Sequence, residues 1–323
     1  MPNSFQALWE SNMARAPFLR FTGALFTVWL ATQTAALAQS ANQVQALANQ
    51  VEQLYKQGRY AEAAKLAERT LSLAEKTLGP GHSDTLRTVE NLGFVYQAEG
   101  RYDEAEPLLE RVLTGRKKTL GWEHSNTLRS AYNLAALYDV QGRSAQAEPL
   151  YEQALAGRKK APGAEHPSML TVVHNLGMLY LRQGRYAKAE PLVKQALAME
   201  EKTLGPDEAS TLWRVNILGK LYSRQGRYGD AEPLLKRALA GYEAIGPEVP
   251  GALQSADTLG ILYLRQGRYG EAEPLLKRAL AGRENALGVE HPDTLDSINN
   301  LAELYKRQGR HPEAEALLKR ARR

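Results

Sequence analysis

The sequence contains no cysteine, and this absence excludes several kinds of chemistry together. Disulfide bridges, thiol nucleophiles, iron–sulfur clusters and cysteine-ligated zinc all require thiols. Aromatic residues make up only 7% of the chain, β-branched residues are sparse, and no run of alternating polarity indicates a strand. The fold must therefore be held together by packing between helices.

Motifs of common catalytic and nucleotide-binding sites are also missing. The chain has no G-x-S-x-G, P-loop, H-E-x-x-H or G-x-G-x-x-G sequence. Histidines recur between the predicted repeats, but residues one repeat apart are too distant to share a zinc ion, which needs its nitrogen ligands about 2 Å away. We therefore expect no enzyme activity, no cofactor and no metal site. The recurring histidines are His82, His124, His166 and His291.

Charge of one sign is not concentrated anywhere except in the short C-terminal end. The chain has 41 basic and 36 acidic residues, a formal net charge of +5, and lysine and arginine alternate with glutamate. This pattern is typical of solvated helix faces. Nucleic acid is not an expected partner, because the basic residues are not interleaved with aromatic ones.

Residues 1–38 differ in composition from the rest of the chain. Arg15 and Arg20 precede an apolar stretch that ends in Ala36-Leu37-Ala38, an order typical of a secretory signal peptide. The stretch is shorter than a membrane span of about 20 residues and is interrupted by polar residues, which disfavours an uncleaved anchor. We expect cleavage after Ala38, a periplasmic or secreted protein, and no stable membrane anchor afterwards. The true start is Met1 or Met13.

The remaining residues, 39–323, repeat one unit of about 42 residues. A Gly-Arg pair marks each copy: Gly58-Arg59, Gly100-Arg101, Gly142-Arg143, Gly184-Arg185, Gly226-Arg227, Gly267-Arg268 and Gly309-Arg310. A fixed period of this length is typical of a solenoid, because one unit alone does not bury its apolar face. The predicted units are 42–79, 83–121, 125–163, 167–205, 209–246, 251–288 and 292–323.

Each Gly-Arg pair lies between two helical patterns. Before it, apolar or small residues fall at i, i+3, i+4 and i+7, as in Val89, Leu92, Gly93 and Tyr96, and six copies share these offsets. After it, small residues such as Ala105 allow a second helix to pack closely. A second turn closes the unit, where we expect Ser83, Asp84 or Asp293 to cap the next helix.

These units resemble tetratricopeptide repeats (TPR) of the kinesin-light-chain type. The resemblance rests on the Gly-Arg-Tyr junction and on three segments: Asn300-Leu301-Ala302-Glu303-Leu304-Tyr305, Glu273-Pro274-Leu275-Leu276-Lys277-Arg278-Ala279-Leu280 and His291-Pro292-Asp293-Thr294-Leu295. It covers residues 42–321. It implies an all-α, right-handed α-solenoid of about seven helix-turn-helix pairs, with a concave groove that is lined by the first helix of each pair and holds peptides or partner proteins.

Helical geometry predicts the same groove independently, because one face of each first helix lies about 140° from the core positions. Arg182, Arg224, Arg265 and Arg307 repeat there in four consecutive units, alongside Glu90, Asp139, Asp257 and Glu303, which dilute the charge. The candidate groove residues are Arg87, Asn91, Arg129, Tyr132, Asn133, His174, Asn175, Arg182, Asn216, Arg224, Arg265, Asn299 and Arg307.

Two interpretations of these groove residues stay open. A row of arginines suits an extended ligand with acidic side chains or a free C-terminus, and it is also what a solvated stripe copied from one ancestral unit looks like. Asn91, Asn133, Asn175 and Asn300 either bind ligand backbone or satisfy a neighbouring helix end.

The sequence predicts a non-enzymatic scaffold that binds a peptide or partner protein in the bacterial periplasm, and on the first interpretation of the arginine row this ligand is acidic. The alternative is a structural protein that assembles with itself. This alternative rests on the last helix, whose apolar side, with Leu317 and Leu318, has no following unit to cover it.

Overall fold

The computed structural model describes residues 38–160 and 167–321, and the account that follows concerns these residues. Most of the predicted signal peptide, residues 1–37, and His166 lie outside them. The chain divides into two compact units after Gly157, within the helix Ser144–Lys160. Each unit is described by itself.

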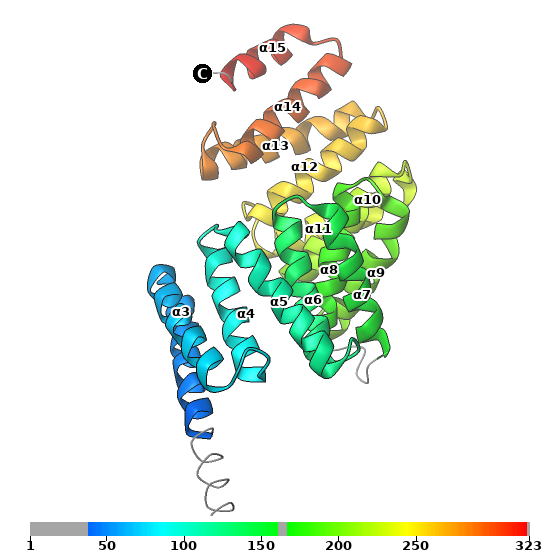
Figure 1. Ribbon diagram of the computed structural model, residues 1–323. Helices are drawn as coiled ribbons and strands as arrows, with labels where there is room; N and C mark the ends of the chain where they lie inside the picture. The colour runs from blue at the N-terminus through cyan, green and yellow to red at the C-terminus, as the bar shows by residue number, and fades with distance from the viewer. Residues whose placement is uncertain (1–37, 161–166, 322–323) are drawn as a thin grey trace, which may run out of the picture. The chain divides into compact units, whose positions relative to one another are not determined.

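Helices joined by short turns make up the described residues, and none of these residues lies in a strand (Figure 1). The predicted all-α fold is thus confirmed. After a helix that covers residues 38–56, the helices are α3 (Tyr60–Thr77), α4 (Ser83–Ala98), α5 (Tyr102–Leu120), α6 (Ser125–Val140), α7 (Ser144–Lys160), α8 (Pro167–Arg182), α9 (Tyr186–Thr203), α10 (Ala209–Arg224), α11 (Tyr228–Ile245), α12 (Pro250–Arg265), α13 (Tyr269–Leu287), α14 (Pro292–Arg307) and α15 (His311–Arg320).

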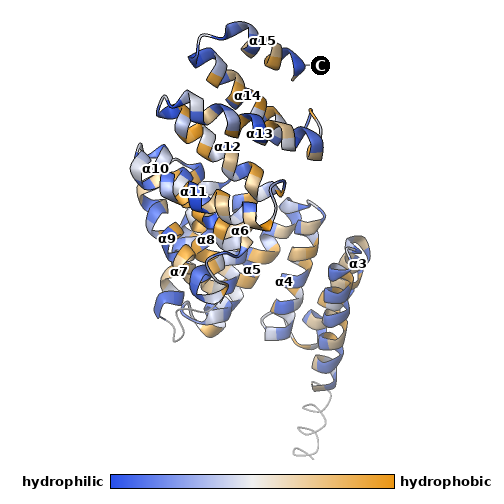
Figure 2. Ribbon diagram, turned by 180° about the vertical axis from the view of Figure 1, so that it is seen from behind, coloured by the Kyte–Doolittle hydropathy of each residue, from blue (hydrophilic) through white to orange (hydrophobic). Residues whose placement is uncertain are grey.

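Helices pack in consecutive pairs, and within each unit one pair also packs against the next. Contacts join α4 to α5, α8 to α9, α10 to α11 and α12 to α13, and the second helix of a pair contacts the first helix of the next, as α11 does with α12. Apolar and polar residues alternate along every labelled helix (Figure 2). Stacking therefore buries the apolar face that a single pair would leave in water.

The apolar positions predicted from the period form the core. In α4, Val89 is fully buried and Leu92 is 4% exposed, and in α5 Ala105 and Val112 are fully buried. Pro107 lies inside α5, and the helix continues through it. Small residues at the crossing let the two helices approach closely, as expected for packing of side-chain ridges into grooves.

The Gly-Arg pair ends the first helix and links neighbouring repeats. Gly100 has φ of 76°, a left-handed conformation that favours glycine. The N–H of Arg101 donates to the carbonyl of Tyr96 at 2.8 Å, and its guanidinium lies 3.8 Å from the centre of the Tyr96 ring. Glycine thus provides the turn, and arginine covers the core tyrosine from outside.

At three junctions of the second unit, this arginine also reaches the preceding repeat. Arg227 donates to Glu190 at 2.8 Å and Arg268 donates to Glu232 at 2.7 Å, in each case about one repeat back along the chain. Arg310 and Glu273 form the same link at 3.0 Å. An exposed edge of the second unit therefore carries a row of ion pairs between repeats.

Helix capping differs from the prediction. The Nδ1 atom of His82 accepts a hydrogen bond of 3.2 Å from the N–H of Asp84, and His291 caps α14 through the N–H of Asp293 in the same way. Ser83, Asp84 and Asp293 were the predicted caps, but each lies within the helix. The capping residue is the one that keeps extended backbone dihedrals before the first turn, and that residue is histidine.

Candidate functional site

All predicted groove residues lie on the first helices of the pairs. In the first unit these helices are α4 and α6, and in the second unit they are α8, α10, α12 and α14. We call the side of these helices that carries the predicted residues the first-helix face, and treat it separately in each unit.

In the first unit, this face is organised around a buried carboxylate. Glu90 is 3% exposed and accepts hydrogen bonds from Arg116 at 2.7 and 2.9 Å, from Arg129 at 3.2 Å and from Asn133 at 3.1 Å. Arg116 is itself 6% exposed and also donates to Ser130 at 2.8 Å. The amide of Asn133 and one nitrogen of Arg129 therefore stabilise the boundary between repeats.

The other predicted residues of the first unit are only partly exposed. Tyr132 is half-buried, with its ring centre 5.8 Å from that of Tyr151. Asn91 is half-buried. Arg87 has two buried nitrogens, Nε and Nη2, that lack a hydrogen-bond partner among the described residues. The first unit thus presents mainly Arg129 to solvent.

A second buried cluster lies between α9 and α10. Arg214 donates to both carboxylate oxygens of Glu200, at 2.7 and 2.5 Å, and contacts the Nδ1 atom of His174 at 2.9 Å. Because arginine only donates, Nδ1 of His174 is the acceptor and the ring proton lies on Nε2. Burial and then the charge of Arg214 lower the pKa of His174. Its ring centre lies 5.4 Å from that of Trp213.

A third buried cluster, between α13 and α14, contains an aspartate. Asp257 is 7% exposed, lies 3.5 Å from Arg283, and accepts hydrogen bonds of 3.2 and 3.1 Å from Asn300. Burial raises the pKa of Asp257, and Arg283 opposes this rise. Arg283 also donates to Ser297 at 2.6 Å.

The cluster next to it, between α11 and α12, carries no charge. Asn216 is 1% exposed and Ser255 is fully buried, and neither Oδ1 of Asn216 nor Oγ of Ser255 has a partner among the described residues. Tyr242 takes the position of Arg116, Glu200 and Arg283, and its hydroxyl donates to the carbonyl of Ala209 at 2.6 Å. Each of these boundaries thus has its own set of polar side chains.

These clusters correct the sequence analysis in one respect. Glu90 and Asp257 were expected to share the groove face and to dilute its positive charge, but both are buried and paired with arginines. The residue pattern of a single helix does not reveal which of its positions the next repeat buries. The next repeat covers both of these residues. Arg116, Arg214 and Glu200 were not predicted at all.

The arginine row of the second unit is exposed. Arg182, Arg224 and Arg265 are the last residues of α8, α10 and α12. Arg265 donates to the carbonyl of Ser223 at 3.3 Å, and partial burial and the charge of Arg224 lower its pKa. Arg224 has no ion-pair partner among the described residues.

The remaining predicted residues of the second unit are divided between solvent and neighbouring side chains. Arg307 ends α14 and forms an exposed ion pair of 2.8 Å with Glu303. Asn299 is exposed, whereas Asn175 is half-buried and interacts within the protein. An exposed ion pair of this kind is weak because solvent screens it, so a ligand carboxylate competes readily with Glu303.

A hollow of about 370 Å³ lies on this face between α8 and α10. Its apolar wall includes Met178, Leu181, Ile217 and Leu221, and its cationic side chains are Arg182, Lys220 and Arg224, with Tyr186 at the start of α9. Among the residues that the structure describes, none lining this hollow is acidic. The hollow therefore combines apolar surface with three cationic side chains.

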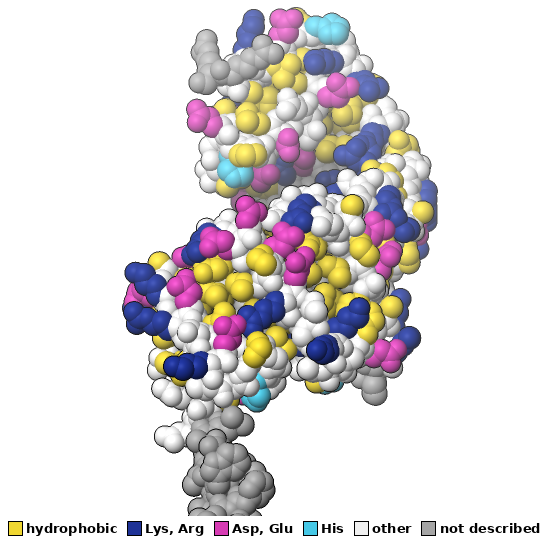
Figure 3. Space-filling view, in the orientation of Figure 1, with side chains coloured by type: hydrophobic (Ala, Val, Ile, Leu, Met, Phe, Trp, Pro, Cys, Tyr) yellow, Lys and Arg dark blue, Asp and Glu magenta, His cyan; other side chains and the backbone are white. Residues whose placement is uncertain are grey.

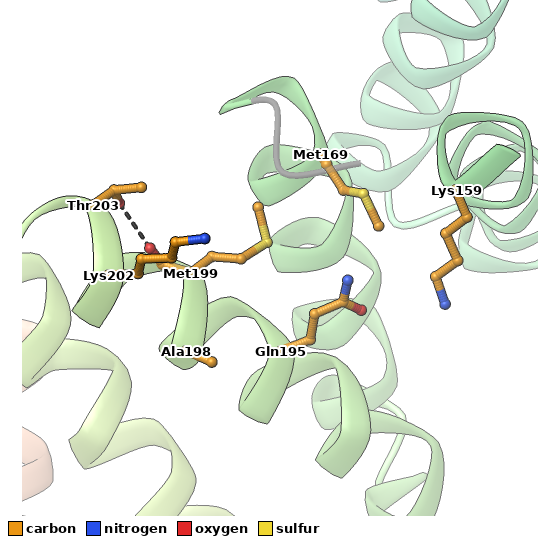
Figure 4. A pocket seen from close by; sticks show the side chains of 7 residues that line it. All are labelled: Lys159, Met169, Gln195, Ala198, Met199, Lys202 and Thr203. Carbon is orange, nitrogen blue, oxygen red and sulfur yellow. Dashed lines mark hydrogen bonds between the residues drawn. The ribbon is translucent and has the colours of Figure 1, made fainter. Parts of the chain in front are cut away.

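A second hollow, of about 420 Å³, lies against α9, and Figure 4 shows its lining side chains. Met169 and Met199 project into it, and Gln195 lies below them (Figure 4). One repeat later, the position equivalent to Gln195 is occupied by Arg237, which donates to Glu201 at 2.7 Å. The hollow thus coincides with an interruption in a second row of ion pairs between repeats.

The rest of the described surface is mixed in character. Cationic, anionic and apolar side chains are interspersed on the face shown in Figure 3. Within residues 38–160 and 167–321, no group of three or more histidine, aspartate or glutamate side chains is placed to hold a metal ion. No helix in the same ranges is both long enough and apolar enough to cross a membrane.

Comparison with known proteins places the chain in a family. The tetratricopeptide repeat family matches residues 42–118, 84–160, 168–244 and 246–323. The chain therefore belongs to the tetratricopeptide repeat family, whose members are typically non-enzymatic scaffolds for protein interactions. A search of curated proteins found no match.

Several solved structures have the same fold. A putative kinesin light chain with nearly identical TPR-like repeats from Podosopora anserina is 30% identical, has a TM-score of 0.56, and is matched over 64% of this chain and 98% of its own. BtubC (BKLC) from P. vanneervenii is 23% identical, with a TM-score of 0.55 over 80% of this chain and 94% of its own. The type IV pilus biogenesis factor PilW is 20% identical, with a TM-score of 0.52 over 74% and 94%.

Proposed function

We propose that the first-helix face of the second unit binds an acidic segment of a partner protein, and that the protein acts as a scaffold in the bacterial periplasm. The observation that carries the proposal is the hollow lined by Arg182, Lys220 and Arg224, which has no acidic side chain among its described lining residues. Arg265 adds a further positive charge beside Arg224. Arginine binds carboxylates in a bidentate manner, which gives such a face both affinity and orientation.

Burial of the neighbouring polar residues supports this assignment. Asp257, Glu200 and Arg214 are buried and engaged in contacts between repeats, so their hydrogen-bonding groups are directed at those contacts and not at a ligand on the surface. The apolar wall of the hollow, with Met178 and Ile217, offers a place for a ligand side chain next to its carboxylate. A ligand that is both acidic and partly apolar fits this combination.

Binding is tested with the purified chain and two fluorescent peptide pools, one of Glu, Ala and Leu and one in which Gln replaces Glu. We expect only the acidic pool to bind, with affinity that falls as salt rises. Arg182→Glu combined with Arg265→Glu should abolish binding. The matched control is Lys236→Glu with Lys277→Glu, which changes the net charge equally on α11 and α13. Equal binding by both double variants would refute the proposal.

Location and self-association need separate measurements. A compartment reporter fused to the C-terminus, with mass spectrometry of the N-terminus, should show export and cleavage after Ala38. An intact N-terminus in the cytoplasm would remove the periplasmic part of the proposal. Sedimentation at high concentration should show a monomer, and a concentration-dependent oligomer without peptide binding would favour self-assembly through the last helix.

A further inference from the structure

We infer that the turns at the ends of α9, α11 and α13 bind a segment of a partner protein that is both basic and apolar. We call these turns, residues 204–208, 245–249 and 287–291, the turn edge. None of their residues lines the hollow between α8 and α10, so the turn edge is a second surface of the second unit.

Each turn of this edge begins with an exposed aliphatic side chain. Leu204 is 52% exposed, Ile245 is 54% exposed and Leu287 is 46% exposed. Val289, in the third turn, is exposed as well. Among the described residues of the second unit, every large hydrophobic side chain that is exposed belongs to this edge. Single exposed apolar residues are common, but a set that recurs at one position of consecutive repeats indicates an interaction surface.

Contacts from the next repeat hold two of these turns in place. Arg237 of α11 pairs with Glu201 of α9 at 2.7 Å and donates to the carbonyl of Pro206 at 3.0 Å. One repeat later, Arg278 of α13 donates to the carbonyl of Pro247 at 2.8 Å. The turns therefore follow one another along the unit, and a surface whose backbone is already fixed loses less entropy when a ligand binds.

The turn edge carries acidic side chains and neither lysine nor arginine. The acidic residues are Asp207, Glu208, Glu248 and Glu290, and none of the four has an ion-pair partner among the described residues. Such carboxylates favour a cationic ligand, and they disfavour an anionic lipid surface. Together with the aliphatic side chains, they select a segment that combines lysine or arginine with apolar residues.

The equivalent turn of the first unit has a different charge. Leu120 is exposed there too, but Lys117 and Lys118 precede it and outnumber Glu123, which follows it. Nζ of Lys117 also lies 5.3 Å from the centre of the Trp122 ring. A basic ligand is therefore favoured by the turns of the second unit and not by this turn of the first.

Three labelled peptides of equal length test the inference. The first consists of lysine and leucine, the second has serine in place of each leucine, and the third has glutamine in place of each lysine. Binding to the full chain is measured by fluorescence anisotropy at fixed salt. We expect only the first peptide to bind, with affinity that falls as salt rises, because it alone offers both positive charge and apolar contact.

Two double variants locate the binding surface. Leu204→Ser with Leu287→Ser should weaken binding of the first peptide about tenfold, because both side chains lose apolar contact with the ligand. The matched control, Leu120→Ser with Val140→Ser, changes two exposed aliphatic residues of the first unit and should retain binding. Equal binding by the two double variants would overturn the inference. Equal binding of the first and second peptides would also overturn it, because charge alone would then explain the affinity.

Charge removal provides a second test. Glu208→Gln with Glu290→Gln should weaken binding, whereas Asp103→Asn with Glu315→Gln, which removes two exposed carboxylates elsewhere, should not.

Sedimentation and the acidic peptide pool separate the remaining outcomes. A wild-type oligomer that becomes a monomer in Leu204→Ser with Leu287→Ser would overturn the inference in favour of a second copy of the chain. The same variant should bind the acidic peptide pool as the wild type does, so either surface can fail its test without the other.

Discussion

Arg116 and Glu90 form a buried ion pair with two hydrogen bonds, of 2.7 and 2.9 Å, at the boundary between two repeats. Two repeats later the charges are exchanged: Glu200 takes the helix position of Arg116, and its partner Arg214 takes the position of Ser130. Equivalent boundaries of one repeating array are thus stabilised by opposite arrangements of charge. Polar groups that are buried and paired in this way restrict which surfaces fit together.

This arrangement predicts that one boundary can be transplanted onto another. Arg116→Glu alone should lower the free energy of unfolding by about 3–5 kcal/mol, because it buries two carboxylates together. Adding Glu90→His and Ser130→Arg reproduces the set found at His174, Glu200 and Arg214, and should restore most of the loss. Urea unfolding of the full chain followed by circular dichroism measures both. A triple variant no more stable than the single one would contradict the prediction.

His174 should make stability depend on pH near neutrality. Burial and Arg214 hold its pKa below the ordinary value of 6.5, so the unfolded chain takes up a proton at higher pH than the folded chain. The stability it contributes is complete above pH 6.5 and is lost as pH falls through the lowered pKa. We expect His174→Gln to flatten the decline of Tm between about pH 7 and 5. The exposed His311→Gln is the control, and an unchanged slope in His174→Gln would speak against this origin.

Glu232 should contribute to acid sensitivity at lower pH. Hydrogen bonds from Arg268 and then Lys236 lower its pKa from 4.5 to about 2. Its contribution to stability is therefore complete above pH 4.5 and lost as pH falls towards 2. Glu232→Gln should be less stable than the wild type at neutral pH and lose less stability on acidification. Thermal unfolding across this range tests it, with Glu315→Gln on the exposed side of α15 as the comparison.

The histidine caps should be replaceable only by other capping residues. His291→Ala removes the acceptor for the N–H of Asp293 and should cost about 1 kcal/mol of stability. His291→Asn should retain most of it, because asparagine accepts the same hydrogen bond. Chemical denaturation of the two variants distinguishes them. Equal losses would show that histidine contributes something other than the cap.

Two glycines at the same repeat position should respond differently to alanine. A Cβ added at Gly219 would lie 2.6 Å from Cδ2 of the buried Leu235, whereas at Gly177 the nearest atom, Cβ of Leu192, lies at 3.5 Å. Gly219→Ala should therefore cost about 1–3 kcal/mol through overpacking. Gly177→Ala should be neutral or slightly stabilising, because alanine favours the helix. Denaturation midpoints provide the test, and similar values for both variants would contradict it.

The period of the sequence was sufficient to predict the helices and their core. Positions such as Leu92 and Gly93 repeat with helical spacing, and the fold follows because every copy has the same apolar side to bury. The caps could not be predicted from residue preference alone, since histidine is not a preferred capping residue. It caps α4 because its Nδ1 atom lies next to the N–H of Asp84.

The buried ion pairs were missed because they join residues of different helices. Glu90 is opposite the core on its own helix, and only the next repeat covers it. One signal was present in the sequence: Arg116 follows Glu90 by 26 residues, and Arg283 follows Asp257 by 283 − 257 = 26 residues. An acid and a base at the same offset in two repeats indicate a contact that the period of a single helix does not reveal.

Distinct polar sets at successive boundaries also limit how such an array changes in length. Recombination between similar repeats readily removes a whole unit, and the core residues of the shortened chain would still match. Loss of α10 and α11, however, would place Glu200 against Ser255 and leave its buried carboxylate without Arg214. An unpaired buried charge costs several kcal/mol. A few buried side chains thus fix the order of repeats that arose as copies of one another.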